Sequence, residues 1–162
     1  MKRIRLLVLL CGMLALTACA LPSRIPLNTT SADELQRRMG KPTEILPNPA
    51  GGEYWYYIYG PAGFETWRFG IDGTRVVRSS DQLIAYEHLH KVKVGVSTEK
   101  DVRMLLGKPA TIMQLRSGPS WEWRANLQSA TGYFVVTFDR NGVASSTAVI
   151  PDFFADGDRG SP

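Results

Sequence analysis

Residues 94–109 read VGVSTEKDVRMLLGKP, and this stretch decides the fold. Ser97 is suited to cap the start of a helix, and a capping box of Thr98 with Asp101 is the alternative one residue further on. Apolar residues then recur at helical spacing: Val102, Leu105 and Leu106. Gly107 stands where a left-handed residue ends a helix, and the proline two positions later cannot continue one. The stretch therefore predicts one short helix with both ends defined.

The same pattern occurs earlier, in residues 30–42, TSADELQRRMGKP. The separation between Gly40 and Gly107 equals the separation between Pro42 and Pro109, and we call it the repeat offset. At this offset Thr30 corresponds to Ser97. Further pairs at the offset are Tyr54 with Trp121 and Tyr56 with Trp123, and two inserted residues then match Phe69 with Phe138 and Asp72 with Asn141. Self-similarity at a fixed period indicates a duplicated structural unit.

The duplication predicts an α+β fold of two tandem units. The first unit covers residues 29–84 and the second covers residues 85–151, each with one or two short helices packed on a three- to four-stranded antiparallel sheet. A unit of about 55 residues has a marginal core of its own when no disulfide or metal supports it. We therefore expect the two units to share an interface, or to continue one sheet, as a single module.

Residues 1–18 are typical of a bacterial lipoprotein signal peptide. Three basic residues within the first five positions precede an apolar run from Leu6 to Leu16, which is too short to span a bilayer. The following sequence, Leu-Thr-Ala-Cys, resembles a lipobox, in which Cys19 is lipidated and becomes the mature N-terminus. An ordinary signal peptide with a chance cysteine is the alternative. Ala20 in place of an aspartate favours the outer membrane over the inner one.

Cleavage before Cys19 changes the composition that matters. The formal net charge falls from +4 to +1, because three of the 19 basic residues leave with the leader. The main argument for a nucleic-acid partner, a strongly positive net charge, therefore does not apply to the mature chain. Cys11 also leaves, so no thiol remains for a disulfide, a metal site or catalysis. We expect residues 19–28 to form a tether and residues 152–162 to form a disordered tail.

One strand of the first unit carries an unusual number of aromatic residues, EYWYYIY at positions 53–59. In the second unit the alternation Trp-Glu-Trp-Arg at 121–124 places the tryptophans inside. Carried back by the repeat offset, this places Tyr54 and Tyr56 in the core. The outward positions are then taken by Trp55, Tyr57 and Tyr59. An outward aromatic stripe predicts a partner-binding surface, and the alternative is that the other unit or the tail covers it.

No motif for chemistry stands out. The two Gly-Lys pairs lack the remainder of a phosphate-binding loop and are followed by proline. His88 and His90 stand without neighbouring cysteines, and exposure to solvent is their simplest interpretation. We expect no catalytic residue, no metal site and no cofactor, and hence no enzyme.

Residues 89–152 resemble the BamE-like (SmpA/OmlA) family of outer-membrane lipoproteins. The motifs that carry the resemblance are GVS at 95–97, LLGKP at 105–109, WEW at 121–123 and FDRNGV at 138–143. The family implies two helices on a three-stranded antiparallel sheet, a periplasm-facing location and a helper role in the β-barrel assembly machine. A tandem pair of such units is similar to the β-lactamase inhibitor protein fold, whose paired sheets form a concave protein-binding face.

These observations predict a lipid-anchored, non-enzymatic outer-membrane lipoprotein that faces the periplasm and binds proteins during envelope or outer-membrane protein assembly. Its expected partners are the membrane, through lipidated Cys19, and envelope proteins, with the β-barrel assembly machine as a candidate. The alternative function is an inhibitor or ligand-binding module that uses the concave face of the paired sheets.

Overall fold

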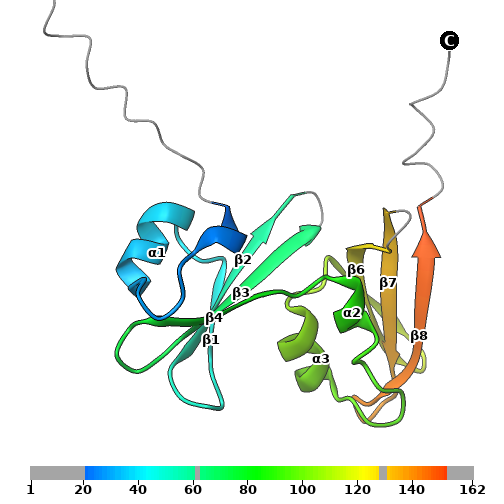
Figure 1. Ribbon diagram of the computed structural model, residues 1–162. Coiled ribbons are helices and arrows are strands. Elements are labelled where there is room, and N and C mark those ends of the chain that lie inside the picture. The colour runs from blue at the N-terminus through cyan, green and yellow to red at the C-terminus, as the bar shows by residue number, and fades with distance from the viewer. Residues whose placement is uncertain (1–20, 61–62, 128–130, 153–162) are drawn as a thin grey trace, which may run out of the picture.

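The computed structural model describes residues 21–60, 63–127 and 131–152 and contains two four-stranded antiparallel sheets (Figure 1). The strand orders are β1-β2-β3-β4 and β5-β6-β7-β8, so each sheet is a simple meander. The predicted α+β fold of two tandem units is confirmed. Cys19 and residues 153–162 lie outside the described residues. No helix in the described part of the chain is long and apolar enough to cross a membrane.

Each half contributes its helices before its strands. The first half consists of a short 3-10 helix Pro22–Arg24, α1 Ala32–Met39, β1 Glu44–Pro47, β2 Glu53–Tyr59, β3 Glu65–Ile71 and β4 Val77–Gln82. The second half consists of α2 Tyr86–Leu89, α3 Glu99–Leu106, β5 Thr111–Leu115, β6 Gly118–Asn126, β7 Thr131–Phe138 and β8 Ala144–Pro151.

The residue that caps the main helix of each unit lies one position after Thr30 and Ser97, the residues that correspond in the sequence repeat. In α3 the Thr98 hydroxyl accepts from the Asp101 amide at 3.2 Å, and the Asp101 carboxylate accepts from the Thr98 amide at 2.9 Å. This is the alternative capping box. Ser97 instead accepts a hydrogen bond from the Lys93 amide at 3.0 Å. The cap of α1 is likewise Ser31 and not Thr30.

The repeat offset holds for the helices and for three strands of each sheet. Ser31 bridges Val76 and Thr98 bridges Val143, which ties each helix cap to the turn before the last strand. The two helix caps and their bridging partners therefore occupy equivalent places in the two units.

The turn before the last strand is held by an aspartate in each unit. The carboxylates of Asp72 and Asp139 each accept two backbone hydrogen bonds within their turns. Asp72 thus corresponds to Asp139 at the unchanged repeat offset. The predicted match of Asp72 with Asn141, and with it the match of Phe69 with Phe138, is wrong because the two inserted residues do not exist.

The second strand of each sheet breaks the repeat offset. Ile45 pairs with Trp55, ten positions further on, whereas Ile112 pairs with Trp121, nine positions further on. The offset in this strand is therefore shorter by one. Gly52 and Gly118 agree with it, because a Cβ at either would lie within 2.3 Å of a backbone carbonyl oxygen. A shift of one residue moves every side chain of a strand to the opposite face of the sheet.

The predicted partner-binding stripe of Trp55, Tyr57 and Tyr59 is therefore wrong. Trp55 is 3% exposed and Tyr57 is 1% exposed, and both pack with Leu35 of α1 and Phe69 of β3 in the core of the first unit. Tyr59 is half-buried. The hydroxyls of Tyr57 and Tyr59 donate to the carbonyls of Gly40 and Met39 where α1 ends, and burial raises the pKa of both phenols.

The aromatic residues on the other face of the first sheet are Tyr54 and Tyr56, and the second unit covers them. Tyr56 is fully buried in one cluster with Leu83 from the first unit and Val102 and Leu106 from α3. Figure 1 shows the resulting layers, which are α1, the first sheet, the helices α2 and α3, and the second sheet. The predicted shared interface between the units is confirmed, and the alternative of one continued sheet is wrong because the two sheets are separate.

The predicted tether is shorter than expected. Ile25 is 6% exposed and packs into the core of the first unit. The Asn28 amide donates to the Val77 carbonyl at 2.8 Å, so this segment is fastened to β4. Ile25 and Asn28 together dock this segment, and residues 21–28 therefore belong to the first unit.

Candidate functional site

The two units meet along one side of α3. Arg68 of β3 donates to the Met104 carbonyl at 2.7 Å and pairs with Asp81 at 3.1 Å. Arg103 of α3 forms an ion pair with Glu44 of β1. Because both arginine side chains are mostly buried, these contacts fix the position of α3 against the first sheet.

Gly107 allows the close approach at the end of α3. Its φ of 75° is typical of glycine, and a Cβ there would lie 3.1 Å from the Thr66 side chain of the first unit. The Gly107 carbonyl also accepts a hydrogen bond from the Trp123 indole at 3.3 Å. This glycine therefore ends the helix, as the sequence predicts, and also serves the contact between the units.

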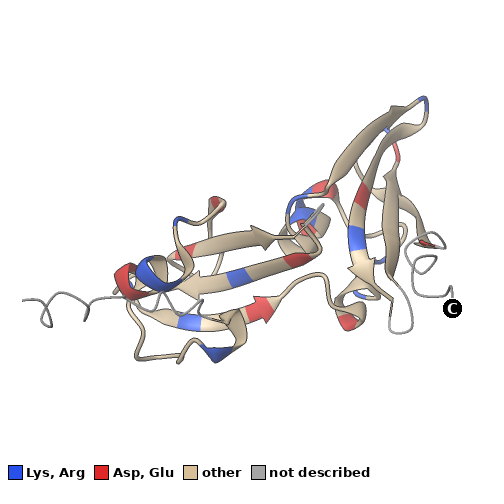
Figure 2. Cartoon of the chain, turned by 90° about the horizontal axis from the view of Figure 1, so that it is seen from above, with Lys and Arg blue, Asp and Glu red and all other residues tan. Residues whose placement is uncertain are grey.

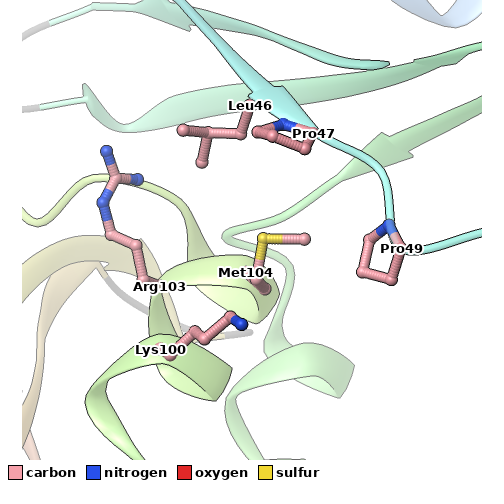
Figure 3. A pocket seen from close by; sticks show the side chains of 6 residues that line it. All are labelled: Leu46, Pro47, Pro49, Lys100, Arg103 and Met104. Carbon is pink, nitrogen blue, oxygen red and sulfur yellow. The ribbon is translucent and has the colours of Figure 1, made fainter. Parts of the chain in front are cut away.

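An apolar cavity of about 460 Å³ opens at this joint (Figure 3). Leu46, Pro47 and Pro49 line it from the first unit, and Lys100, Arg103 and Met104 line it from α3. A second hollow of about 350 Å³ shares Pro49 and Met104 and extends past Tyr54, Arg68 and Leu105. We call the two hollows together the joint groove.

Basic groups border the joint groove. Lys100 is exposed at its rim. Nη1 of Arg103 and Nε of Arg68 are buried and have no hydrogen-bond partner among the described residues. Asp101 also lines the groove, but hydrogen bonds from the amide and hydroxyl of Thr98 hold it in the helix cap and lower the pKa of its carboxyl. The groove therefore offers apolar surface, with the exposed Lys100 at its rim as a donor for a carboxylate or a carbonyl.

The joint groove lies far from the start of the described chain. In Figure 1 the chain begins on the upper edge, and β8 also ends there. The loop between β1 and β2, which supplies Pro49, lies on the lower edge with the start of α3. A molecule anchored through its N-terminus would carry this groove on the side away from the anchor.

Sequence reasoning missed the joint groove, although one signal for it exists. At the repeat offset, Met104 and Leu105 of α3 correspond to Arg37 and Arg38 of α1. In α1 these arginines are exposed and pair with Glu34 of the same helix. An apolar pair where the sister helix is charged indicates that this side of α3 meets another surface.

No metal-ligand cluster of three or more His, Cys, Asp or Glu residues occurs among the described residues. His90 is exposed and packs edge to face on Tyr86, as expected for a solvent-facing side chain. His88 is half-buried, and its Nδ1 lies 3.3 Å from the Leu83 carbonyl oxygen.

The fold and the groove define a class, that of a tandem α+β protein with an apolar groove at the joint of its two units. No protein-family model and no curated protein sequence matches the chain. Among solved structures the chain is similar to the DUF4309 family protein YjgB from Bacillus subtilis, with 8% identity and a TM-score of 0.33. The similarity covers 82% of this chain and 86% of that one. It is distant, and we transfer no function from it.

Proposed function

We propose that the protein is a lipid-anchored, non-enzymatic lipoprotein of the outer membrane that binds another envelope protein through the joint groove. The observation that carries the proposal is the groove itself, an apolar surface formed where the two units meet. Apolar grooves with a few polar groups are typical binding sites, and segments of partner proteins also bind in apolar grooves.

The position of the joint groove agrees with an N-terminal anchor. The leader and Cys19 favour lipidation, and the chain from Leu21 onward is soon fastened to the first unit. The groove on the opposite edge would then face the periplasm and not the lipid. A soluble or periplasm-facing protein segment is therefore the favoured ligand.

The BamE-like resemblance supports a narrower version, in which the partner is a component of the β-barrel assembly machine. The inhibitor alternative is less favoured. It requires a concave face shared by the two sheets, and α3 lies between them (Figure 1). The face of the first sheet that looks toward the second is occupied by Tyr56 and Met104 in contact.

Site-specific crosslinking in cells tests the proposal. A photoreactive phenylalanine analogue replaces Ala50 in the groove of the full-length lipoprotein, and Thr74 in the exposed turn before β4 serves as the control position. We expect Ala50 to capture one envelope protein that Thr74 does not. Recovery of a barrel-assembly component supports the narrow version.

Two further results would contradict the proposal. The first is equal crosslinking from both positions, because it would remove the role of the groove. The second concerns the lipid anchor. We expect the protein with its natural sequence to incorporate radioactive palmitate and Cys19→Ser to incorporate none. If the protein with its natural sequence also incorporates none, the lipoprotein assignment is wrong, while the groove assignment remains intact.

A further inference from the structure

The two sheets end in four edge strands, and they differ in how they discourage pairing with another strand. β1 carries Glu44 and Pro47, and β4 carries Arg78 and Asp81. β8 ends in proline, although its Val149 and Ile150 are 48% and 49% exposed. Charges and prolines are common means of protecting a sheet edge. β5, with the sequence TIMQL, contains neither of these.

The side chains of β5 are bare on both faces of the second sheet. Every residue of the strand is exposed. Ile112 is 53% exposed on the face that carries Trp121, whereas Met113 and Leu115 are 46% and 48% exposed on the opposite face. An unpaired strand edge with large apolar residues on both faces is a template for one more strand.

The residues at the two ends of β5 are basic, and Glu122 of β6 lies opposite Thr111. Lys108 precedes the strand and Arg116 follows it, and both are exposed. Between Asp101 and Glu122 the sequence contains no acidic residue. Arg140 from the neighbouring turn also reaches this end, where its Nη2 donates to the Arg116 carbonyl at 3.5 Å. Figure 2 shows basic residues at the tip of the β5–β6 hairpin.

We propose that the free edge of β5 binds an extended segment of a partner protein that has apolar side chains in its centre and acidic residues at its ends. The backbone of the incoming segment pairs with the unpaired side of β5 and extends the second sheet by one strand. Its apolar side chains pack on Ile112 from one face and on Met113 and Leu115 from the other. Its acidic ends meet Lys108 and Arg116.

A second copy of this chain is the weaker candidate for the same edge. Antiparallel pairing of β5 with its copy around Met113 places Arg116 opposite Ala110. The Lys108 of the copy then lies at the diagonal position beside Arg116. Like charges at neighbouring cross-strand positions are unfavourable. The charge pattern thus selects an acidic partner over self-association, and this surface is separate from the joint groove.

Peptide binding to the purified, detergent-solubilised lipoprotein tests the inference. The probe is a fluorescent nine-residue peptide of alternating valine and threonine with glutamate at both ends, and the matched probe has lysine at both ends. We expect the acidic probe to bind at least about tenfold more tightly in fluorescence anisotropy. Equal affinity for the two probes, or no binding of the acidic one, overturns the proposal.

The repeat supplies a matched pair of variants. Ile112→Lys charges the edge of β5, and Ile45→Lys makes the same change at the corresponding position of β1, where the side chain is 47% exposed. We expect Ile112→Lys to weaken binding of the acidic probe by about tenfold or more and Ile45→Lys to leave it unchanged. Equal weakening by both variants contradicts the assignment to β5. Thermal melts of both variants show that the fold is intact.

Charge reversal separates the partner from a second copy. The double variant Lys108→Glu with Arg116→Glu should prefer the lysine-ended probe. Light scattering over a range of concentrations should show a monomer for the unmodified protein. A dimer that Ile112→Lys dissociates would show that the occupant is a second copy, and would overturn the acidic partner.

Discussion

The two sheets are built from the same repeated unit, yet they are buried in different ways. β7 of the second sheet alternates between buried and half-buried residues along its whole length, because only one of its faces is covered. β2 of the first sheet contains three successive buried residues, Trp55, Tyr56 and Tyr57. That sheet lies between α1 and α3, so both of its faces are covered. The burial pattern of a strand therefore depends on the place of its unit in the tandem.

The two main helices, α1 and α3, also differ in what covers the side that faces away from their own sheet. α1 covers one face of the first sheet and presents Arg37 and Arg38 to solvent. α3 covers the second sheet and presents Met104 and Leu105 toward the first one. A helix at the end of a tandem needs a polar outer face, whereas a helix inside it needs apolar residues on two sides.

The largest expected effect tests the register of β2. Trp55→Ala removes a side chain that is 3% exposed, and Trp121→Ala removes its counterpart in β6, which is 9% exposed. We expect each to lower the free energy of unfolding by about 3–5 kcal/mol, because a large cavity is left in a core. Urea unfolding measures the loss. Near-normal stability of Trp55→Ala would show that Trp55 faces outward, and would contradict its equivalence with Trp121.

The next effect tests the inner side of α3. Met104→Arg copies the sister residue of α1 into the joint, and we expect it to cost about 1–3 kcal/mol because a charge enters a half-buried apolar contact beside Arg68 and Arg103. The converse change, Arg37→Met, alters an exposed position and should stay within about 0.5 kcal/mol. Equal effects in chemical unfolding would show that the two helices have equivalent surroundings.

A smaller effect compares the helix caps. Thr98→Ala removes the hydroxyl that accepts from Asp101, and Ser31→Ala removes the hydroxyl that accepts from Glu34. We expect each to cost about 1 kcal/mol. The Thr98 change should be the larger, because Asp101 also loses the hydroxyl that donates to it at 2.7 Å. Thermal melts rank the two, and the reverse order would contradict the role of the capping box.

The smallest effect compares the two aspartate turns as pH falls. Hydrogen bonds from the Val76 amide, the Thr74 hydroxyl and Arg78 hold the pKa of Asp72 well below its usual range, and backbone hydrogen bonds from Val143 and Asn141 lower the pKa of Asp139. A folded-state pKa below the unfolded one adds stability above the unfolded pKa of about 3.9, and this stability is lost as pH falls through the folded pKa.

Replacing either aspartate should therefore flatten the dependence of stability on pH below about 4. We expect Asp72→Asn to flatten it more than Asp139→Asn, because Asp72 has the additional charged donor Arg78. Urea midpoints measured between pH 2 and pH 5 would decide this. An identical slope in both variants would show that Arg78 contributes nothing to the difference.

The repeat, the glycine helix ends and the presence of a sheet in each unit were predictable because they depend on local chemistry. Gly40 and Gly107 have φ values of 81° and 75°, as the helix stops require. The placement of Trp55 and Tyr57 was not predictable from the repeat offset. Between paired positions, the connection from β1 to β2 is one residue longer than the connection from β5 to β6, and this difference exchanges the faces on which the side chains of β2 lie. In the sequence, the only signal for the joint groove was a difference between the two copies of the unit. The second copy has Met104 where the first copy has Arg37.

The sequence by itself determined that the chain contains two copies of a unit made of a helix and a meander sheet. Helix caps, turns and apolar alternation depend on a few neighbouring residues, and these residues recur in both copies. Only the tertiary structure decided which side of the aromatic strand faces α1, because strand pairing sets a register that a single loop residue can shift. It alone also decided that α3 fills the space between the sheets. That contact joins residues far apart in the chain, and it depends on the positions where the two copies differ.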